Sequence, residues 1–394
     1  MKKYFFSILL ICNLLLISFL NFDKILLLFI NLSSDKTKFE YTTDFFNPIY
    51  ANFYRSFKLD KSLNGIAINL NNFQLLWATN SDDKIKKNTD FYLNNYELFY
   101  LNQEDEDILS TLGITLENVK KAGGIKTIFS INNNIYTYVT FEKNGCGRGV
   151  IFNMSTKLPE IEFPCLPDND LIDLGSSGGA FIHLKDGTYL LTTGTPTSAS
   201  KKIKDLAQDQ RSPYGKILRL NLNSQGKLSY TIFSSGHRNP QGIFEVNNTI
   251  FSTEHGPKGG DELNIIRLNS NYGWPDNSLG SNYDLSPINK SPLILNNINS
   301  VLPFYSFVPS IGINSIADCP VSYAKYYIPL RCISVSSLKD GSIYIIVLNP
   351  SLDRVLFSER LHFNYRIRKF KFIEDTLFAI TDNHKIIIGK LLKL

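Results

Sequence analysis

The amino-acid sequence predicts an all-β fold, and two observations lead to it. From Leu63 onward, short runs of β-branched and aromatic residues alternate with turns rich in Asn, Asp and Gly, which is the pattern of antiparallel strands. These hairpins recur to the C-terminus without alternating helices, which argues against a parallel α/β sheet. The recurrence favours radially repeated sheets, a β-propeller, over a pair of β-sandwiches. No repeat is regular enough to give the number of sheets.

The individual hairpins are placed by their turns. Asn132–Asn134 and Lys185–Gly187 interrupt two of the strand patterns, and such residues tolerate the backbone angles of tight turns. The expected hairpins are 125–141, 179–194, 216–233, 242–253, 331–348 and 368–388.

One segment, Glu104–Lys121, departs from the strand pattern. Its apolar residues stand near helical spacing, and Gly123 can cap the end of a helix. We therefore expect a short surface helix there, outside the repeated sheets.

The N-terminus has the charge pattern of an export signal. Lys2 and Lys3 precede an almost unbroken apolar run, Tyr4–Leu20, as in secretory signals. No alanine occurs before Ala51, so there is no A-x-A cleavage site, and a second apolar run, Ile25–Leu32, follows. Residues 1–32 are therefore expected to be either a signal peptide or a membrane anchor. In both cases the positive end stays in the cytoplasm, and the rest of the chain is periplasmic or extracellular.

The remaining residues divide into an extension and a domain. Residues 33–60 mix polar and aromatic side chains without a clear period and are interpreted as a linker. Residues 61–394 are interpreted as the propeller. The whole chain has 41 basic and 36 acidic side chains, a net charge of +5. This balance is too weak to indicate a nucleic-acid partner.

The cysteines agree with export. Apart from Cys12 there are four, Cys146, Cys165, Cys319 and Cys332, and an even number in an exported chain suggests disulfides. Four cysteines allow three pairings. We favour the two local ones, Cys146 with Cys165 and Cys319 with Cys332, against the alternative of four buried free thiols.

The special residues concentrate in one stretch, 234–275. Two polar loops, His237–Gly242 and Glu254–Glu262, flank a strand pattern there, and loops on a β scaffold commonly carry a site. The Gly256–Pro257 turn can aim backbone carbonyls at a hard cation such as calcium. Arg238 can present its guanidinium to the carboxylates of a planar anionic cofactor.

The order of these motifs is more specific than any one of them. GHRNPQG, then EHGPKGGDELN, then NYGWP resembles the signature of the pyrroloquinoline quinone (PQQ) dependent glucose/sorbosone dehydrogenase family. The resemblance runs from about Gly123 to the C-terminus and includes Ala207–Leu220. It implies a six-bladed exported propeller that oxidises the C1 hydroxyl of a sugar with PQQ and calcium.

The resemblance also implies roles for single residues. Arg238 and Asn239 match the pair that contacts the cofactor, and the carbonyls of Gly256 and Pro257 match the calcium ligands. Lys339, and the pair Arg366 and Arg368, match segments whose cations meet the anionic edges of PQQ.

Two positions depart from the family pattern on the substrate side. Ser176 stands where the family has the histidine that takes the substrate's proton, with Gly175 before it, and Ala122 stands where it has a substrate-facing glutamine. Losing a general base costs about 10²- to 10⁴-fold in rate. Five histidines remain as substitutes, but no catalytic residue is assigned among them: His183, His237, His255, His362 and His384.

Three functions remain open at this point. The first is a PQQ- and calcium-dependent dehydrogenase acting on a small sugar or aldehyde with an altered pocket. The second is a catalytically lapsed relative that still binds PQQ or calcium and serves as a carbohydrate-binding or sensing module. The third is a propeller that only binds other proteins.

Overall fold

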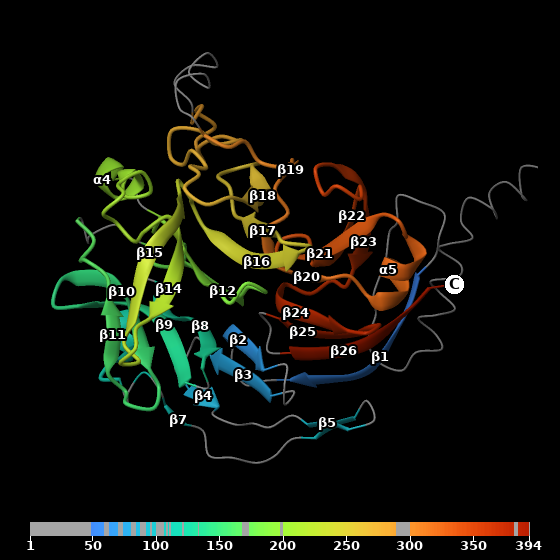
Figure 1. The fold of residues 1–394 in the computed structure, drawn as a ribbon, viewed down its shortest axis with the longest axis horizontal. Coiled ribbons are helices and arrows are strands. Elements are labelled where there is room, and N and C mark those ends of the chain that lie inside the picture. The colour runs from blue at the N-terminus through green and yellow to red at the C-terminus, as the bar shows by residue number, and fades with distance from the viewer. Residues whose placement is uncertain are drawn as a thin grey trace, which may run out of the picture.

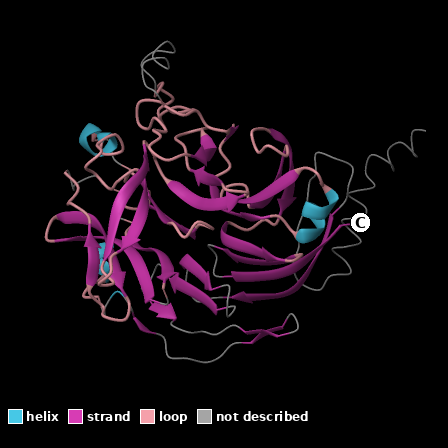
Figure 2. Ribbon diagram, viewed as in Figure 1, coloured by secondary structure: helices cyan, strands magenta, loops and turns pink. Residues whose placement is uncertain are grey.

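Within residues 49–107 the computed structural model describes only the backbones of the strands. After that it describes residues 109, 112–119, 122–132, 134–167, 173–197, 200–288, 300–381 and 385–393. Strands dominate these residues (Figure 2). The expected signal or anchor, 1–32, lies outside the described residues. None of the helices in the described residues is long and apolar enough to cross a membrane.

The described strands form six four-stranded antiparallel sheets and one small hairpin. The first three large sheets are β2 (Leu63–Asn69), β3 (Gln74–Thr79), β4 (Lys84–Lys86) and β7 (Glu106–Asp107); β8 (Gly124–Ile131), β9 (Asn134–Lys143), β10 (Cys146–Asn153) and β11 (Pro159–Glu162); and β12 (Gly178–His183), β13 (Tyr189–Thr193), β14 (Lys216–Leu222) and β15 (Leu228–Ser235).

The other three large sheets include both the earliest and the latest described strands. They are β16 (Pro240–Val246), β17 (Thr249–Glu254), β18 (Asp261–Ile266) and β19 (Tyr305–Phe307); β20 (Ile313–Asp318), β21 (Arg331–Ser337), β22 (Ser342–Leu348) and β23 (Val355–His362); and β24 (Ile367–Ile373), β25 (Thr376–Thr381), β26 (Lys385–Lys393) and β1 (Ile49–Lys58). The hairpin is β5 (Tyr92–Asn94) with β6 (Glu97–Phe99).

The first strand of each sheet contacts the first strand of the next. β2 contacts β8, and the series continues through β12, β16, β20 and β24, which returns to β2. The sheets are therefore arranged radially around a centre (Figure 1). This confirms the all-β fold and the β-propeller architecture, with six sheets in the described part of the chain.

The last sheet is completed by the earliest strand. β1 pairs antiparallel with β26, with Ile49 opposite Lys393. The two strands lie side by side in Figure 1. Ile49–Lys58 falls inside the segment interpreted as a linker, 33–60, yet its backbone is an edge strand. The domain boundary at residue 60 stays a prediction.

Five of the expected hairpins each coincide with a pair of strands, and the segment 368–388 coincides with the three strands β24, β25 and β26. The turn between β8 and β9 includes Asn132 with a positive φ of 47°, as the Asn-rich turn predicts. Apolar side chains fill the space between sheets. Phe129 of β8, for example, stacks on Phe181 of β12 with ring centroids 4.4 Å apart.

The helix expected over Glu104–Lys121 is wrong in two places. Glu106–Asp107 form β7, and Leu116–Val119 form only a 3₁₀ helix, η1. Gly113 separates them with a φ of 69°, a left-handed conformation that cannot continue a helix. Two further short helices in the described residues are α4 (Lys201–Asp205) and α5 (Val321–Tyr326).

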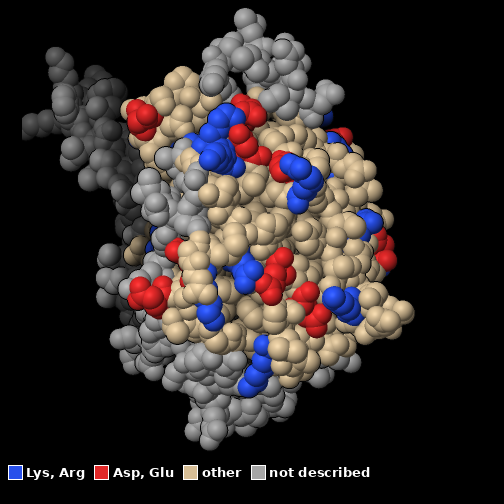
Figure 3. Space-filling model, turned by 90° about the vertical axis from the view of Figure 1, so that its left-hand side faces the viewer, with Lys and Arg blue, Asp and Glu red and all other residues tan. Residues whose placement is uncertain are grey.

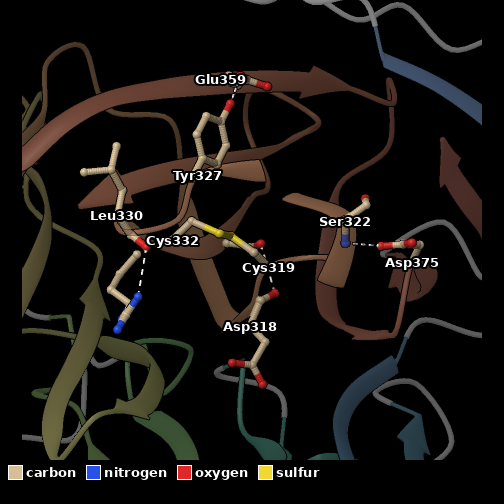
Figure 4. Close-up of a disulfide and its surroundings, with 10 residues drawn as sticks. Asp318, Cys319, Ser322, Tyr327, Leu330, Cys332, Glu359 and Asp375 are labelled. Carbon is tan, nitrogen blue, oxygen red and sulfur yellow. Dashed lines mark hydrogen bonds between the residues drawn. A yellow bond between two sulfur atoms is a disulfide. The ribbon is translucent and has the colours of Figure 1, made fainter. Parts of the chain in front are cut away.

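Both favoured disulfides are present. The Cα atoms of Cys146 and Cys165 lie 5.1 Å apart, and those of Cys319 and Cys332 lie 5.8 Å apart. The second disulfide lies near the buried Tyr327, whose hydroxyl donates a hydrogen bond to Glu359 (Figure 4). Disulfides persist in oxidising compartments, which agrees with the predicted export.

Candidate functional site at the mouth of the propeller

A buried carboxylate fixes the loop that carries the first predicted cofactor residues. Glu254, at the end of β17, accepts hydrogen bonds from the backbone N–H groups of Arg238 and Asn239. Its other oxygen lies 3.0 Å from His237 Nδ1. His237 is fully buried and its Nε2 lies 2.8 Å from Ser234 Oγ. His237 therefore has a structural role in holding this loop.

The side chains of Arg238 and Asn239 point to different neighbours. The Arg238 guanidinium donates to the His255 carbonyl at 3.0 Å and lies 5.3 Å from the centre of the Trp274 ring. The Asn239 side-chain oxygen accepts from the Gly178 N–H at 3.0 Å. Asn239 therefore connects this loop to the start of β12.

The predicted calcium loop is held by a second buried carboxylate. Asp261 accepts from the Gly256 N–H at 3.2 Å and from the N–H groups of Gly312 and Ile313 at 2.6 and 2.9 Å. A Cβ on Gly256 would lie 1.6 Å from the Gly260 carbonyl oxygen, so only glycine fits. The Pro257 carbonyl accepts a long bond of 3.4 Å from Gly260. In the described residues, no group of three or more His, Cys, Asp or Glu side chains could hold a metal.

The remaining predicted cations lie on the neighbouring sheets. Lys339 is exposed just after β21, and the Arg366 guanidinium donates to the adjacent Leu338 carbonyl at 3.3 Å. Arg368 is half-buried at the second position of β24.

Electrostatics at His255 show which of these cations act on the same place. The pKa of His255 is lowered to about 4, mainly by burial; Asp261 raises it, and the charges of Arg238, Arg368 and Arg366 add to the lowering. Three arginines distant in sequence therefore act on one imidazole. The structure brings these predicted residues together, and their role in binding a cofactor stays a prediction.

A cavity of about 310 Å³ opens among the first strands of the ring. Its walls come from the beginnings of β8, β12, β16 and β24, so it lies at the mouth of the propeller. The lining residues are Val119, Ala122, Gly123, Lys126, Gly175, Gly178, Gly179, Gln241, Arg368 and Lys369.

The loop of Ala122 and the loop of Gly175 approach each other at this cavity, and both residues line it. A Cβ on Gly175 would lie 3.3 Å from the Ala122 Cβ. Ser176 follows Gly175, and its hydroxyl lies 2.6 Å from the Thr197 hydroxyl, which is not a base at neutral pH. The departure from the family pattern expected at Ala122 and Ser176 stays a prediction.

Sequence reasoning missed two lysines in the cavity wall. Lys126 Nζ donates to the Ala122 carbonyl at 2.8 Å, and Lys369 Nζ donates to the Gln241 carbonyl at 3.1 Å. Burial lowers the pKa of Lys126 to about 7 and that of Lys369 to about 8. The sequence signal is weak: Lys126 stands in a strand that is mostly apolar, but Lys369 lies between Arg368 and Lys371 on β24.

The sequence of residues 127–392 matches the profile of the Glucose / Sorbosone dehydrogenase family. The chain belongs to this family. This confirms the resemblance drawn from the motifs, including the quinoprotein sugar dehydrogenases to which the motifs pointed.

Three similar proteins match this chain over short stretches of sequence only. An uncharacterised Synechocystis protein, slr1608, is 34% identical over 131 residues, which is 30% of this chain and 28% of that protein. Quinoprotein glucose dehydrogenase B of Acinetobacter calcoaceticus is 40% identical over 79 residues, 18% of this chain and 16% of that protein. Aldose sugar dehydrogenase YliI of Escherichia coli is 40% identical over 91 residues, 20% of this chain and 24% of that protein. Each match therefore spans less than a third of the relative's length.

Similar structures cover far more of the chain. The soluble aldose sugar dehydrogenase of Escherichia coli in its apo-form covers 88% of this chain and 100% of its own, with a TM-score of 0.63 and 18% identity. The PQQ-bound aldose sugar dehydrogenase of Streptomyces coelicolor covers 88% and 99%, with a TM-score of 0.58 and 18% identity. At this identity the likeness establishes the fold.

Proposed function

We propose that this chain is an exported PQQ- and calcium-dependent dehydrogenase of small sugars or aldehydes. One observation carries the proposal: the charges of Arg238, Arg366 and Arg368 act on the buried His255 imidazole, with the Arg238 guanidinium bonded to the His255 carbonyl at 3.0 Å and Arg368 in the wall of the cavity. Three guanidinium groups near one residue, one of them in a cavity wall, suit a ligand with several carboxylates, as PQQ has.

The donor set also suits the metal. Calcium prefers oxygen ligands, including backbone carbonyls, and Gly256 and Pro257 supply carbonyls in a turn fixed by Asp261. Both Asp261 oxygens already accept backbone N–H groups, so this side chain shapes the loop. When bound, the quinone supplies the acceptor for the two electrons removed from the substrate. Arg238, Asn239, Lys339, Arg366 and Arg368 would hold and orient it.

A second function is favoured by the substrate side of the cavity. Ala122 cannot hydrogen-bond through its side chain, and the Ser176 hydroxyl is hydrogen-bonded to the hydroxyl of Thr197, which is not a base. A lapsed enzyme that retains PQQ or calcium, as a carbohydrate-binding module, would have such a pocket. A protein-interaction propeller is the remaining alternative.

A cofactor titration separates these functions. The full-length chain is titrated with PQQ in the presence and absence of Ca²⁺, and both the visible absorbance and the melting temperature are recorded. Binding at a hundredfold excess over Kd stabilises the fold by about 2.7 kcal/mol, so a clear rise in melting temperature is expected. No spectral change and no thermal shift would reject the first two functions together.

Dye reduction then separates the enzyme from the module. With PQQ and Ca²⁺ bound, a panel of aldoses and simple aldehydes is assayed with an artificial electron acceptor. We expect reduction above the rate of free PQQ. Binding of PQQ with only background reduction would leave the module.

A further inference from the structure

Lys126 occupies the place where the sequence departs from its family. It is the third residue of β8, and its ammonium binds the carbonyl of Ala122 at 2.8 Å. Ala122 and Gly175 line the same cavity, and a Cβ on Gly175 would lie 3.3 Å from the Ala122 Cβ. The amine therefore lies beside Ala122 and borders the cavity that Gly175, the neighbour of Ser176, also lines.

The opposite strand leaves room for this lysine. A Cβ on Gly179 would lie 2.8 Å from the Lys126 Cβ, so a larger residue on β12 would displace the lysine stem. Lys126 is only 8% exposed but lines the cavity. Its stem is packed and its amine borders the space that a substrate would enter.

We propose that Lys126 is the catalytic base of this site, and that its amine takes the proton for which position 176 has no imidazole. The inference rests on the proposed dehydrogenase function and deepens it. Lys126 would accept the proton of a sugar C1 hydroxyl, or of the hydrate of an aldehyde.

The charge state of Lys126 is compatible with this role. The pKa of Lys126 is lowered to about 7, mainly by burial, while Asp173 raises it and Arg368 lowers it. The other charged groups in the cavity wall are Arg368 and Lys369, and burial lowers the pKa of Lys369 to about 8. With a pKa near 7, a substantial part of the Lys126 side chains are free amines at neutral pH, which is the condition for efficient general base catalysis.

The proton and electron balance closes with the groups already named. The substrate O–H bond breaks and its proton goes to Lys126 Nζ, while the C1–H bond breaks and its electron pair leaves as hydride to the quinone. A C1 carbonyl forms, giving a lactone from a cyclic sugar or a carboxylic acid from an aldehyde hydrate. The resulting ammonium returns its proton to solvent or to the reduced cofactor.

Trace acetylation of the full-length wild-type chain, without cofactor, tests the state of the amine directly. The chain is treated with a small amount of acetic anhydride from about pH 5 to about pH 11, both folded and unfolded in urea, and each lysine is read by mass spectrometry. We expect half-maximal labelling of Lys126 near pH 7 in the folded chain and near the ordinary lysine value of about 10.4 in the unfolded chain. Equal Lys126 midpoints in the folded and unfolded chain would overturn the proposal.

Two variants test the chemistry. Lys126→Met removes the amine, and Lys126→Arg keeps a positive charge that cannot be lost in this pH range. In both we expect turnover with PQQ and Ca²⁺ to fall by about 10²- to 10⁴-fold, with PQQ affinity retained. The rise of kcat/KM through about pH 7 should disappear. The matched control is Lys371→Met. Lys371 also lies on a strand of the inner ring, β24, but it does not line the cavity.

The outcomes distinguish this inference from the proposed function. Wild-type turnover that survives in Lys126→Met or Lys126→Arg overturns the inference alone. A wild-type chain that binds no PQQ, or binds it without turnover, overturns the enzyme and the inference together. If Lys126→Met does not fold, small primary amines added to Lys126→Ala provide the same test, because rescue that depends on the amine's pKa identifies a missing base.

Discussion

Lys126 and Lys216 are two buried lysines whose surroundings differ. Burial lowers the pKa of each to about 7. Lys216 is enclosed, and its Nζ donates to the carbonyls of Leu206, Ala207 and Tyr214 at 2.8, 2.8 and 2.9 Å. Lys126 has one such bond, to Ala122, and borders a cavity.

The comparison teaches that burial and a lowered pKa do not identify a functional lysine. The three carbonyls around Lys216 use all the donors of an ammonium, so this side chain anchors the loop that leads into β14. Lys126 keeps donor or acceptor capacity beside an open space. The number of fixed acceptors and the presence of a cavity separate an anchor from a candidate base.

The largest expected effect is on stability. Lys216→Met would remove the ammonium donor from three carbonyls, of which that of Ala207 keeps the N–H of Gly236, and each unsatisfied buried group costs about 1–3 kcal/mol. We expect a loss of about 3 kcal/mol in the free energy of unfolding, measured by urea denaturation. Lys126→Met should cost less than about 1 kcal/mol. Equal losses in the two variants would remove the distinction between anchor and base.

A second prediction concerns turnover and tests whether one base replaces another. Ser176→His is introduced into the wild type and into Lys126→Met. In the Lys126→Met background we expect the new imidazole to raise turnover by about 10²-fold, whereas the wild type should change by less than about tenfold. A gain of equal size in both backgrounds would mean that the two groups act independently.

The pH dependence of stability gives a third prediction with a definite sign. The folded-state pKa of Lys126 lies near 7, below the ordinary value of about 10.4. Between these values the unfolded state binds more protons, so this lysine makes the free energy of unfolding rise with pH. Lys126→Met should therefore show a smaller rise than the wild type from pH 7 to about pH 9. The free energy of unfolding is measured by urea denaturation at each pH. If it rises with pH equally in Lys126→Met and in the wild type, the lowered pKa is contradicted.

The smallest expected effect is on the labelling of Lys126. Arg368 lowers the pKa of Lys126 but is not among the charges that act on Lys216. Arg368→Met should raise the acetylation midpoint of Lys126 by a fraction of a unit and leave that of Lys216 unchanged. Arg366→Met serves as the control, because Arg366 does not act on Lys126. A parallel shift of both lysines would indicate a general change in the fold.

Much of the fold could be predicted from local sequence, because hairpins carry their own signals. Turn residues such as Asn132 mark the ends of strands, and the local cysteine pairs close loops of the right size. The expected helix over Glu104–Lys121 failed because its spacing ignored the break at Gly113. The number of sheets came from the family resemblance, since the repeats have little sequence in common.

The candidate site could be predicted from its residues mainly where it lies in loops, and Arg368 on β24 was predicted through the family resemblance. Arg238 and Gly256 belong to motifs with polar residues and tight turns, and these stand out in a sequence. Lys126 and Lys369 lie within strands, and their shared cavity arises only when the ring brings β8 and β24 to opposite sides of β2. That arrangement depends on closure of the whole propeller, which no short stretch of sequence encodes. Charged side chains elsewhere are less informative, because both signs are interspersed over the face shown in Figure 3.

The pairing of β1 with β26 has a consequence for the order of folding. Residue 49 is synthesised long before its partner, residue 393. The edge strand β1 therefore cannot pair with the last sheet until nearly the whole chain has been made. Pairing across such a separation must overcome a large loop-closure entropy, and contacts distant in sequence slow folding. A chain that crosses a membrane during synthesis would therefore close its ring on the far side, after its last strand has arrived.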